Sequence, residues 1–185
     1  NGSLVARAYQ GTIDFFTSNG YELNQNLFVF PYDWRKDISL TASLLDQKID
    51  SIKQQTGSSK VDIIAHSMGG LVARNYISDS SRASNVRKLF TLGTPHLGSI
   101  NSLKALRFGD CLAVEIGPFC LSIAPSEVKD VIQNMISNFQ LVPTQEYFKF
   151  YSNFDNKRPY PYKTEKVLNY AQTKDFLSSH GHNTS

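Results

Sequence analysis

The chain has 185 residues, of which 41% are hydrophobic and 19% charged, and its formal net charge is +3. That length suffices for one ordinary hydrophobic core but not for two full domains. The sequence has no run of like charges of the kind that binds nucleic acids or membranes. No stretch approaches the roughly 18 consecutive apolar residues of a transmembrane helix.

The first predicted strand is the apolar run Leu27–Phe30, which Pro31 ends and which we expect to be buried on both faces. A helix is predicted over residues 38–56, because apolar residues recur there on one helical face. Asp37 precedes this helix with a side chain typical of an N-cap, and Gly57 follows it where a C-terminal glycine is expected.

A second buried strand is predicted at Val61–Ala65 and a third strand at Val86–Leu92, with a helical segment, Leu71–Ile77, between them. The alternation of strands and helices predicts a parallel sheet covered by helices, with right-handed crossovers. Ligands of such sheets bind beyond the carboxyl ends of the strands. Three polar or turn-forming loops should lie at that edge: 31–35, 66–70 and 93–99.

The regular alternation stops in the second half of the chain. Ser126–Phe139 is predicted to be one amphipathic helix, and the chain after it is aromatic and irregular. We interpret residues 1–99 as the core segment and residues 100–185 as a cap or lid within the same domain; the alternative is that the second segment is the rest of the core. Cys111 and Cys120 would form a disulfide in an exported protein and would otherwise be buried thiols.

One pentapeptide carries specific chemistry. Residues 65–69 read Ala-His-Ser-Met-Gly, which matches the G-x-S-x-G nucleophile elbow with alanine in place of the first glycine. In that elbow a serine sits at a strained turn from strand to helix, and small flanking residues let the helix pass close to the strand. Ser67 would attack an acyl carbonyl, and the backbone N–H of Met68 would face the developing oxyanion. The alternative is a serine that merely caps the following helix.

Two more motifs accompany the elbow, which continues to Arg74: Phe30–Arg35 (Phe-Pro-Tyr-Asp-Trp-Arg) and Phe90–Ser99, which contains Gly-Thr-Pro-His. Together the three resemble the α/β-hydrolase superfamily and, more narrowly, the lecithin:cholesterol acyltransferase family, which also holds phospholipid:diacylglycerol acyltransferases and a lysosomal phospholipase. Bacterial lipases with Ala-His-Ser-x-Gly elbows are the near alternative. The resemblance implies a partial α/β-hydrolase fold with a mainly helical or irregular cap after the third strand. Leu141–Thr144 resembles the segment that closes the cap in that family.

The resemblance also implies roles for single residues. Ser67 corresponds to the nucleophile and Met68 to one oxyanion donor. The Tyr-Asp-Trp-Arg motif is expected to be mainly structural, with its aspartate and arginine tying down a loop beside a buried Trp34. His96 is expected to fix its loop. His66 is expected to turn away from the nucleophile and to pack, rather than to act as the base.

The remaining catalytic groups are harder to find. A triad in this fold runs in the order serine, acid, histidine. Asp155, after a predicted edge strand at Tyr147–Phe154, and His180 have that order and are the candidate acid and base if the chain is complete; Asp175 and His182 are further candidates. No upstream strand ending in His-Gly is found to supply a second oxyanion donor. We therefore expect an internal fragment of a longer lipase-like protein, nearly inactive by itself.

The expected function is ester hydrolysis or O-acyl transfer on lipid esters through an acyl-enzyme on Ser67. We expect a lipid or small ester as substrate, and contact of the amphipathic helix and the aromatic cap with a lipid surface. This chemistry needs no cofactor or metal, and the sequence indicates no nucleic-acid partner. The alternative is a catalytically inactive α/β-hydrolase-like binding module. Hydrolysis versus transfer and the oligomeric state stay open, as does localisation, with export slightly favoured.

Overall fold

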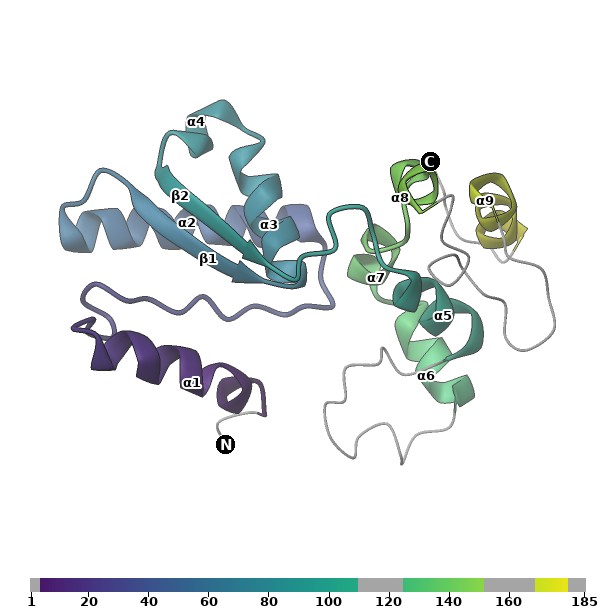
Figure 1. Ribbon diagram of the computed structural model, residues 1–185, viewed down its shortest axis with the longest axis horizontal. Helices are drawn as coiled ribbons and strands as arrows, with labels where there is room; N and C mark the ends of the chain where they lie inside the picture. The colour runs from purple at the N-terminus through teal and green to yellow at the C-terminus, as the bar shows by residue number, and fades with distance from the viewer. Residues whose placement is uncertain (1–3, 110–124, 152–168, 180–185) are drawn as a thin grey trace.

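The computed structural model describes residues 4–109, 125–151 and 169–179. Two strands with their helices form one part of the molecule, and shorter helices form another, joined by the segment that follows β2 (Figure 1). In chain order the elements are α1 (Leu4–Ser18), α2 (Ile38–Thr56), β1 (Val61–His66), α3 (Met68–Ile77), α4 (Ser80–Ala83), β2 (Val86–Leu92), α5 (Ile100–Phe108), α6 (Pro125–Ile132), α7 (Ile136–Gln140), α8 (Gln145–Phe150) and α9 (Tyr170–Ser179).

The two predicted strands β1 and β2 are confirmed, and they pair in parallel with Ile64 opposite Phe90. On one face of the pair, Val61 and Ile63 pack against the core that α2 and α3 form. On the other face, Ile64, Phe90 and Leu92 are 49%, 51% and 55% exposed. The prediction that Val61–Ala65 is a buried strand is therefore wrong for this face, because the described residues leave these side chains about half exposed.

Helix α2 begins and ends where its sequence predicts. The Asp37 side chain accepts hydrogen bonds from the backbone N–H groups of Ser39 and Leu40, which satisfies two of the unpaired donors of the first turn. Gly57 ends the helix with a left-handed φ of 69°. Its apolar face forms the main core with α3, and the buried members are Ile38, Ala42, Leu45, Ile49, Val72 and Tyr76.

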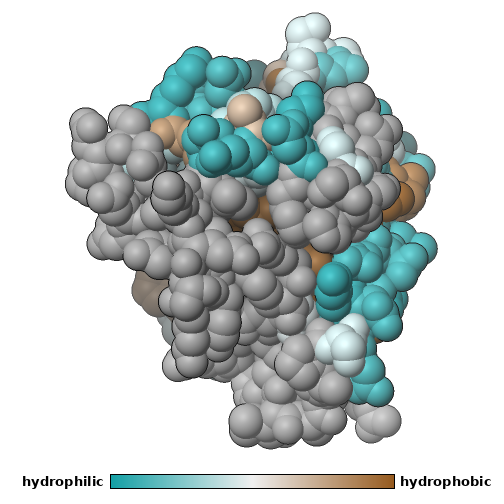
Figure 2. All heavy atoms as spheres, turned by 90° about the vertical axis from the view of Figure 1, so that its right-hand side faces the viewer, coloured by the Kyte–Doolittle hydropathy of each residue, from teal (hydrophilic) through white to brown (hydrophobic). Residues whose placement is uncertain are grey.

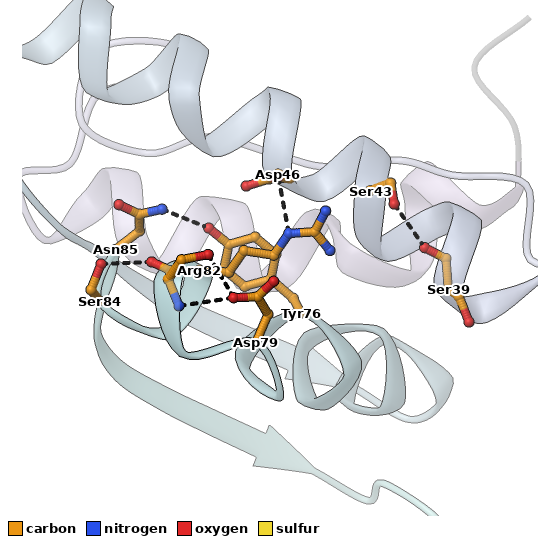
Figure 3. Close-up of polar contacts among 9 residues, drawn as sticks. Ser39, Ser43, Asp46, Tyr76, Asp79, Arg82, Ser84 and Asn85 are labelled. Carbon is orange, nitrogen blue, oxygen red and sulfur yellow. Dashed lines mark hydrogen bonds and ion pairs between the residues drawn. The ribbon is translucent and has the colours of Figure 1, made fainter.

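Polar contacts fasten α2 to α3, α4 and the amino end of β2 (Figure 3). The Nε atom of Arg82 lies 3.0 Å from Oδ2 of Asp46, and the guanidinium lies 5.9 Å from the centre of the Tyr76 ring. Asn85 donates from Nδ2 to the Tyr76 hydroxyl at 3.1 Å and accepts from Nζ of Lys53. These contacts brace the sheet at the end opposite to the predicted elbow.

The apolar run Leu27–Phe30 is not a strand, contrary to the prediction. An isolated bridge joins Leu23 to Leu27, and Val29 is 46% exposed. A strand needs a neighbouring ladder for its backbone groups, and the ladder present in the described residues joins β1 to β2 alone. Phe30 still packs against the main core, so the run is partly buried without being paired.

The described helices after β2, α5 to α9, are called the cap here as a name alone, and they have a small core of their own where α5 meets α6. Its buried members are Leu103, Ala105, Leu106, Ile132 and Met135. The single helix predicted over residues 126–139 is wrong, because α6 ends at Ile132 and α7 begins at Ile136. Between them Asn134 donates from its side chain to the carbonyl oxygen of Asp130, and Met135 adopts an extended backbone. Such local side-chain bonds compete with a continuing helix.

The edge strand predicted at residues 147–154 is also wrong where the structure describes it. Residues 145–150 form the helix α8, and the Thr144 side chain caps it by accepting from the N–H of Tyr147. Tyr147 and Phe148 are buried, so the aromatic residues of this segment pack as a helix face rather than as a strand face.

Residues 141–144 join the cap to the loop after β2, and we call this contact with residues 97–99 the clasp. Two backbone hydrogen bonds form it, from the N–H of Ser99 to the carbonyl of Leu141 at 2.7 Å and from the N–H of Thr144 to the carbonyl of Leu97 at 2.9 Å. Gly98 has a φ of 96°, and a Cβ atom there would lie 2.3 Å from the carbonyl oxygen of Val142. Glycine is therefore required at this position for both conformation and space.

Gln140 adds a second contact between the cap and the core. Its Oε1 atom accepts a hydrogen bond from the N–H of Ile38 at 2.8 Å, and its Nε2 atom donates to Oδ2 of Asp37 at 2.9 Å. One side chain of α7 thus completes the capping of α2.

The surface seen from the cap side is chemically mixed (Figure 2). Hydrophilic side chains cover most of the coloured area, and hydrophobic ones appear in separate patches. Val131, Ile136 and Phe150 are exposed apolar side chains of the cap. Within the described ranges, no helix combines the length and the apolar character needed to cross a bilayer.

Candidate active site

The turn from β1 to α3 holds Ser67 in a backbone conformation that residues other than glycine rarely adopt. Its φ is 53° and its ψ is −128°. Its side chain is exposed, and its hydroxyl makes no capping bond to α3. The interpretation of Ser67 as a helix-capping serine is therefore wrong. Backbone strain of this kind persists only where the surrounding fold imposes it.

Backbone hydrogen bonds hold this turn from two sides. The N–H of Ser67 donates to the carbonyl of Leu92, the last residue of β2, at 2.9 Å, and the N–H of Gly70 donates to the carbonyl of Ser67 at 3.0 Å. Met68 is the first residue of α3, so its N–H has no acceptor within the helix. The helix dipole adds positive potential at the same place.

The tightest packing at the elbow is at Gly70. A Cβ atom on Gly70 would lie 1.9 Å from Oγ1 of Thr94, whereas one on Gly69 would lie 3.6 Å from the Tyr32 hydroxyl and 3.9 Å from Cβ of Ala65. The last two distances are ordinary contacts. A side chain at residue 70 is therefore excluded by Thr94 in the loop after β2. Close passage of α3 over its own strand β1 does not exclude one at residue 69.

His66, directly before Ser67, contacts helix α1. Its Nδ1 atom lies 3.0 Å from the hydroxyl of Tyr9, and the two rings meet edge to face with centroids 5.9 Å apart. Sequence reasoning missed Tyr9, because no local pattern shows that α1 approaches the carboxyl end of β1. The contact places α1 beside the elbow.

The predicted loop-tying role of Asp33 and Arg35 is confirmed. Nε and one terminal nitrogen of Arg35 each lie 2.8 Å from an oxygen of Asp33. The hydrogen bonds from the Arg35 side chain lower the pKa of Asp33 to about 2. Trp34 was expected to be buried beside this pair but is 45% exposed. The pair closes within the loop itself and needs no aromatic covering.

His96 lies in the loop after β2, and its contacts agree with the predicted loop-fixing role. Its Nε2 atom lies 3.3 Å from Oγ1 of Thr91, and its N–H donates to the carbonyl of Thr94 at 2.9 Å. Its own carbonyl accepts from the Arg74 side chain at 3.3 Å.

Tyr32 was also missed, although it lies inside the Tyr-Asp-Trp-Arg motif. Its ring stacks on Phe30 with centroids 5.8 Å apart, and its hydroxyl reaches the first turn of α3. Burial raises the pKa of Tyr32 to about 12, and the nearby Tyr9 adds to the effect. The sequence signal that pointed to Tyr32 was its position in the loop 31–35, which was predicted to lie at the carboxyl edge of the sheet.

A family comparison agrees with these features. The family model described as lecithin:cholesterol acyltransferase matches residues 3–182. The chain belongs to the lecithin:cholesterol acyltransferase family. This family implies an α/β-hydrolase fold, and the two-stranded parallel sheet with its helices is consistent with part of that fold. The resemblance seen in the motifs is thereby confirmed.

Curated relatives in and around the lecithin:cholesterol acyltransferase family share about a third of the aligned residues. Phospholipase A(1) LCAT3 of Arabidopsis thaliana is 32% identical over 95 residues, which cover 49% of this chain and 21% of the relative. GPI inositol-deacylase of Candida albicans is 36% identical over 84 residues, covering 45% and 20%. An uncharacterized protein of Saccharomyces cerevisiae, YJR098C, is 38% identical over 88 residues, covering 47% and 13%. The matches span about a fifth or less of these relatives. No solved structure matches the chain.

Several residues singled out in the sequence lie outside the described residues: Cys111, Cys120, Asp155, His180 and His182. Asp175 is described and lies exposed on α9. In the part of the chain that the structure describes, no cluster of three or more His, Cys, Asp or Glu side chains could hold a metal ion. The acid and the base therefore remain predictions.

Proposed function

We propose that the protein containing this chain hydrolyses or transfers acyl groups of lipid esters through an acyl-enzyme on Ser67. The observation that supports this most directly is the strained conformation of Ser67 at a turn between a parallel strand and a helix. Such strain gathers at functional sites, and in the nucleophile elbow it exposes the serine hydroxyl above the sheet.

In the proposed reaction, Oγ of Ser67 attacks the acyl carbonyl carbon while a base removes the hydroxyl proton. The carbonyl oxygen becomes an oxyanion that faces the N–H of Met68. When the bond to the alcohol breaks, the alcohol leaves with the proton from the base, and the acyl group stays on the serine. Water or a second alcohol then attacks, so hydrolysis and transfer differ in this acceptor alone. If this chain itself carries the acid and the base, Asp155 and His180 are the candidates; otherwise both groups lie elsewhere in the longer protein.

Lipid esters are the proposed substrate class because of the family and the relatives that the chain matches. It belongs to the lecithin:cholesterol acyltransferase family, and its relatives include proteins named phospholipase A(1) and GPI inositol-deacylase. Both names fit ester cleavage in a lipid. The exposed apolar side chains of Val131, Ile136 and Phe150 fit contact of the cap with a lipid surface.

The test is covalent labelling of the full-length protein with a fluorophosphonate probe, which reacts with activated serines. We expect the native protein to be labelled and Ser67→Ala not to be. Ser78→Ala, which removes another exposed hydroxyl just beyond α3, should be labelled like the native protein. A well-folded full-length protein that takes no label would contradict the proposal and favour an inactive binding module.

A further inference from the structure

One hydroxyl group beside the elbow has no part in the reaction described so far. Tyr32 stacks on Phe30 with an angle of 24° between the ring planes, and both rings pack against the main core. The ring is therefore held firmly. Its hydroxyl, by contrast, makes no hydrogen bond in the described part of the chain. The Tyr32 oxygen is not one of the fully buried unpaired atoms of the described residues, so it stays accessible and can donate to a ligand in place of water.

Gly69 shows where this hydroxyl lies. A Cβ atom on Gly69 would lie 3.6 Å from the Tyr32 oxygen. Because Cβ atoms in a helix tilt toward its N-terminus, the contact is on the side of Gly69 that faces the start of α3. Met68 comes directly before Gly69, about 1.5 Å along the helix axis. The same Cβ atom would lie 3.9 Å from Cβ of Ala65, so the hydroxyl lies between the end of β1 and the first turn of α3. The Met68 N–H is at that same end of α3, and Ser67 directly precedes Met68 in the chain.

The hydroxyl also keeps its proton. Burial raises the pKa of Tyr32 to about 12, and Tyr9 adds to the effect. At neutral pH the phenol is therefore fully protonated and can donate one hydrogen bond.

We propose that Tyr32 is a catalytic residue whose hydroxyl donates a hydrogen bond to the oxyanion formed on the acyl group at Ser67. The inference rests on the proposed function, because it needs an acyl oxygen at this place. Tyr32 forms and breaks no covalent bond, and its proton stays on the phenol. The oxyanion then has a side-chain donor in addition to the N–H of Met68. Sequence reasoning sought a further donor in an upstream His-Gly loop and found none there.

The experiment compares Tyr32→Phe with the native full-length protein in the cleavage of a p-nitrophenyl acyl ester. The substitution keeps the ring stacked on Phe30 and removes the hydroxyl alone. We expect kcat to fall by about 10²-fold, the usual effect of removing one oxyanion donor, while KM and the thermal unfolding midpoint stay unchanged. Tyr21→Phe is the matched control, because Tyr21 is an exposed tyrosine that contacts Phe16, and its kcat should not change.

A second measurement separates an oxyanion donor from a structural residue. An acyl trifluoromethyl ketone forms a negatively charged adduct with a nucleophilic serine, whereas the matching alcohol binds without an oxyanion. Tyr32→Phe should weaken binding of the ketone by about the same factor as kcat and leave binding of the alcohol unchanged. Equal weakening of both ligands, or a lowered unfolding midpoint, would show a structural role and overturn the inference.

The two proposals fail in different ways. If Ser67→Ala still takes the fluorophosphonate label, the nucleophile assignment fails and the role of Tyr32 falls with it. If Ser67→Ala loses the label while Tyr32→Phe keeps full kcat, the inference about Tyr32 fails alone.

Discussion

Thr94 occupies the space that a side chain on Gly70 would need. A Cβ atom on Gly70 would lie 1.9 Å from Oγ1 of Thr94 and 2.8 Å from its Cβ. Within the described residues this Oγ1 is buried and has no hydrogen-bond partner, so the contact is one of shape. The turn at Ser67 is thus held by the loop of the neighbouring strand as well as by its own strand.

Gly70→Ala should destabilise the protein. The added methyl group forces Thr94 or the first turn of α3 to move, and overpacking of this kind costs about 1–3 kcal/mol of unfolding free energy. Gly69→Ala is the matched control, because its methyl group would meet ordinary contacts at 3.6 and 3.9 Å. Urea denaturation of both variants checks this. Equal losses in the two would show that the contact with Thr94 is not what excludes a side chain.

Ser67→Gly should be more stable than Ser67→Ala. Glycine adopts a φ of 53° with a ψ of −128° without the steric strain that alanine retains, so we expect a difference of about 1 kcal/mol in unfolding free energy. Asn24→Gly is a control at the other non-glycine position of positive φ in the described ranges. Because asparagine tolerates left-handed conformations, Asn24→Gly should raise the unfolding free energy by less than the difference between Ser67→Gly and Ser67→Ala. Thermal denaturation would contradict the strain argument if Ser67→Ala were the more stable variant.

Gly98→Ala tests the clasp. Alanine would be strained at a φ of 96°, and its Cβ would press on the backbone oxygen of Val142. Gly20→Ala carries comparable strain, at a φ of 88°, but has no atom within 4 Å of the added carbon. We expect Gly98→Ala to lose about 1–3 kcal/mol more unfolding free energy than Gly20→Ala, because the clasp backbone cannot yield cheaply. Faster proteolysis at residues 141–144 in Gly98→Ala should accompany the loss.

The unfolding free energy should depend on pH through Asp37. Burial alone would raise the pKa of this carboxyl, but hydrogen bonds from Leu40, Ser39 and Gln140 lower it below its ordinary value of 3.8. A carboxyl whose pKa is lower in the folded state stabilises the fold above the ordinary pKa. That contribution is lost as the pH falls through the lowered value. Asp37→Asn should therefore flatten the fall in unfolding free energy below about pH 4.

Gln140→Ala complements this measurement. It removes one hydrogen bond to Asp37 and leaves the N–H of Ile38 without its acceptor, which should cost about 1–2 kcal/mol near neutral pH. Gln140→Ala should also remove part of the fall in unfolding free energy at low pH. An unchanged pH profile in both variants would mean that the α2 cap does not titrate with folding.

Elements with local signals were predictable from the sequence. Helix α2 has its N-cap at Asp37 and its terminal glycine at Gly57, both adjacent in the chain to the turns they stabilise. The strands β1 and β2 and the turn at Ser67 were found for the same reason, since a short apolar run, a serine and two glycines specify a strand, a sharp turn and a helix within a dozen residues.

Features that depend on distant partners were not predictable. Leu27–Phe30 has the composition of a strand, but a strand forms only when another segment offers a ladder. Whether Trp34 is buried depends on what packs over its loop, and the approach of Tyr32 to Gly69 joins two loops whose meeting no periodicity reveals. At the break between α6 and α7, Asn134 bonds to the backbone through its side chain and Met135 is extended, and hydrophobic spacing reveals neither feature.

The clasp has a consequence for selectivity. The loop that it closes starts at Leu92, whose carbonyl oxygen accepts the N–H of Ser67, and reaches the cap at residues 97–99 within seven positions. A ligand that moved residues 97–99 would therefore act through this loop on the peptide group of Leu92 that accepts the N–H of Ser67. Under the function proposed above, acyl chains that contact the clasp differently should be discriminated by how fast they react, and not by how tightly they bind alone.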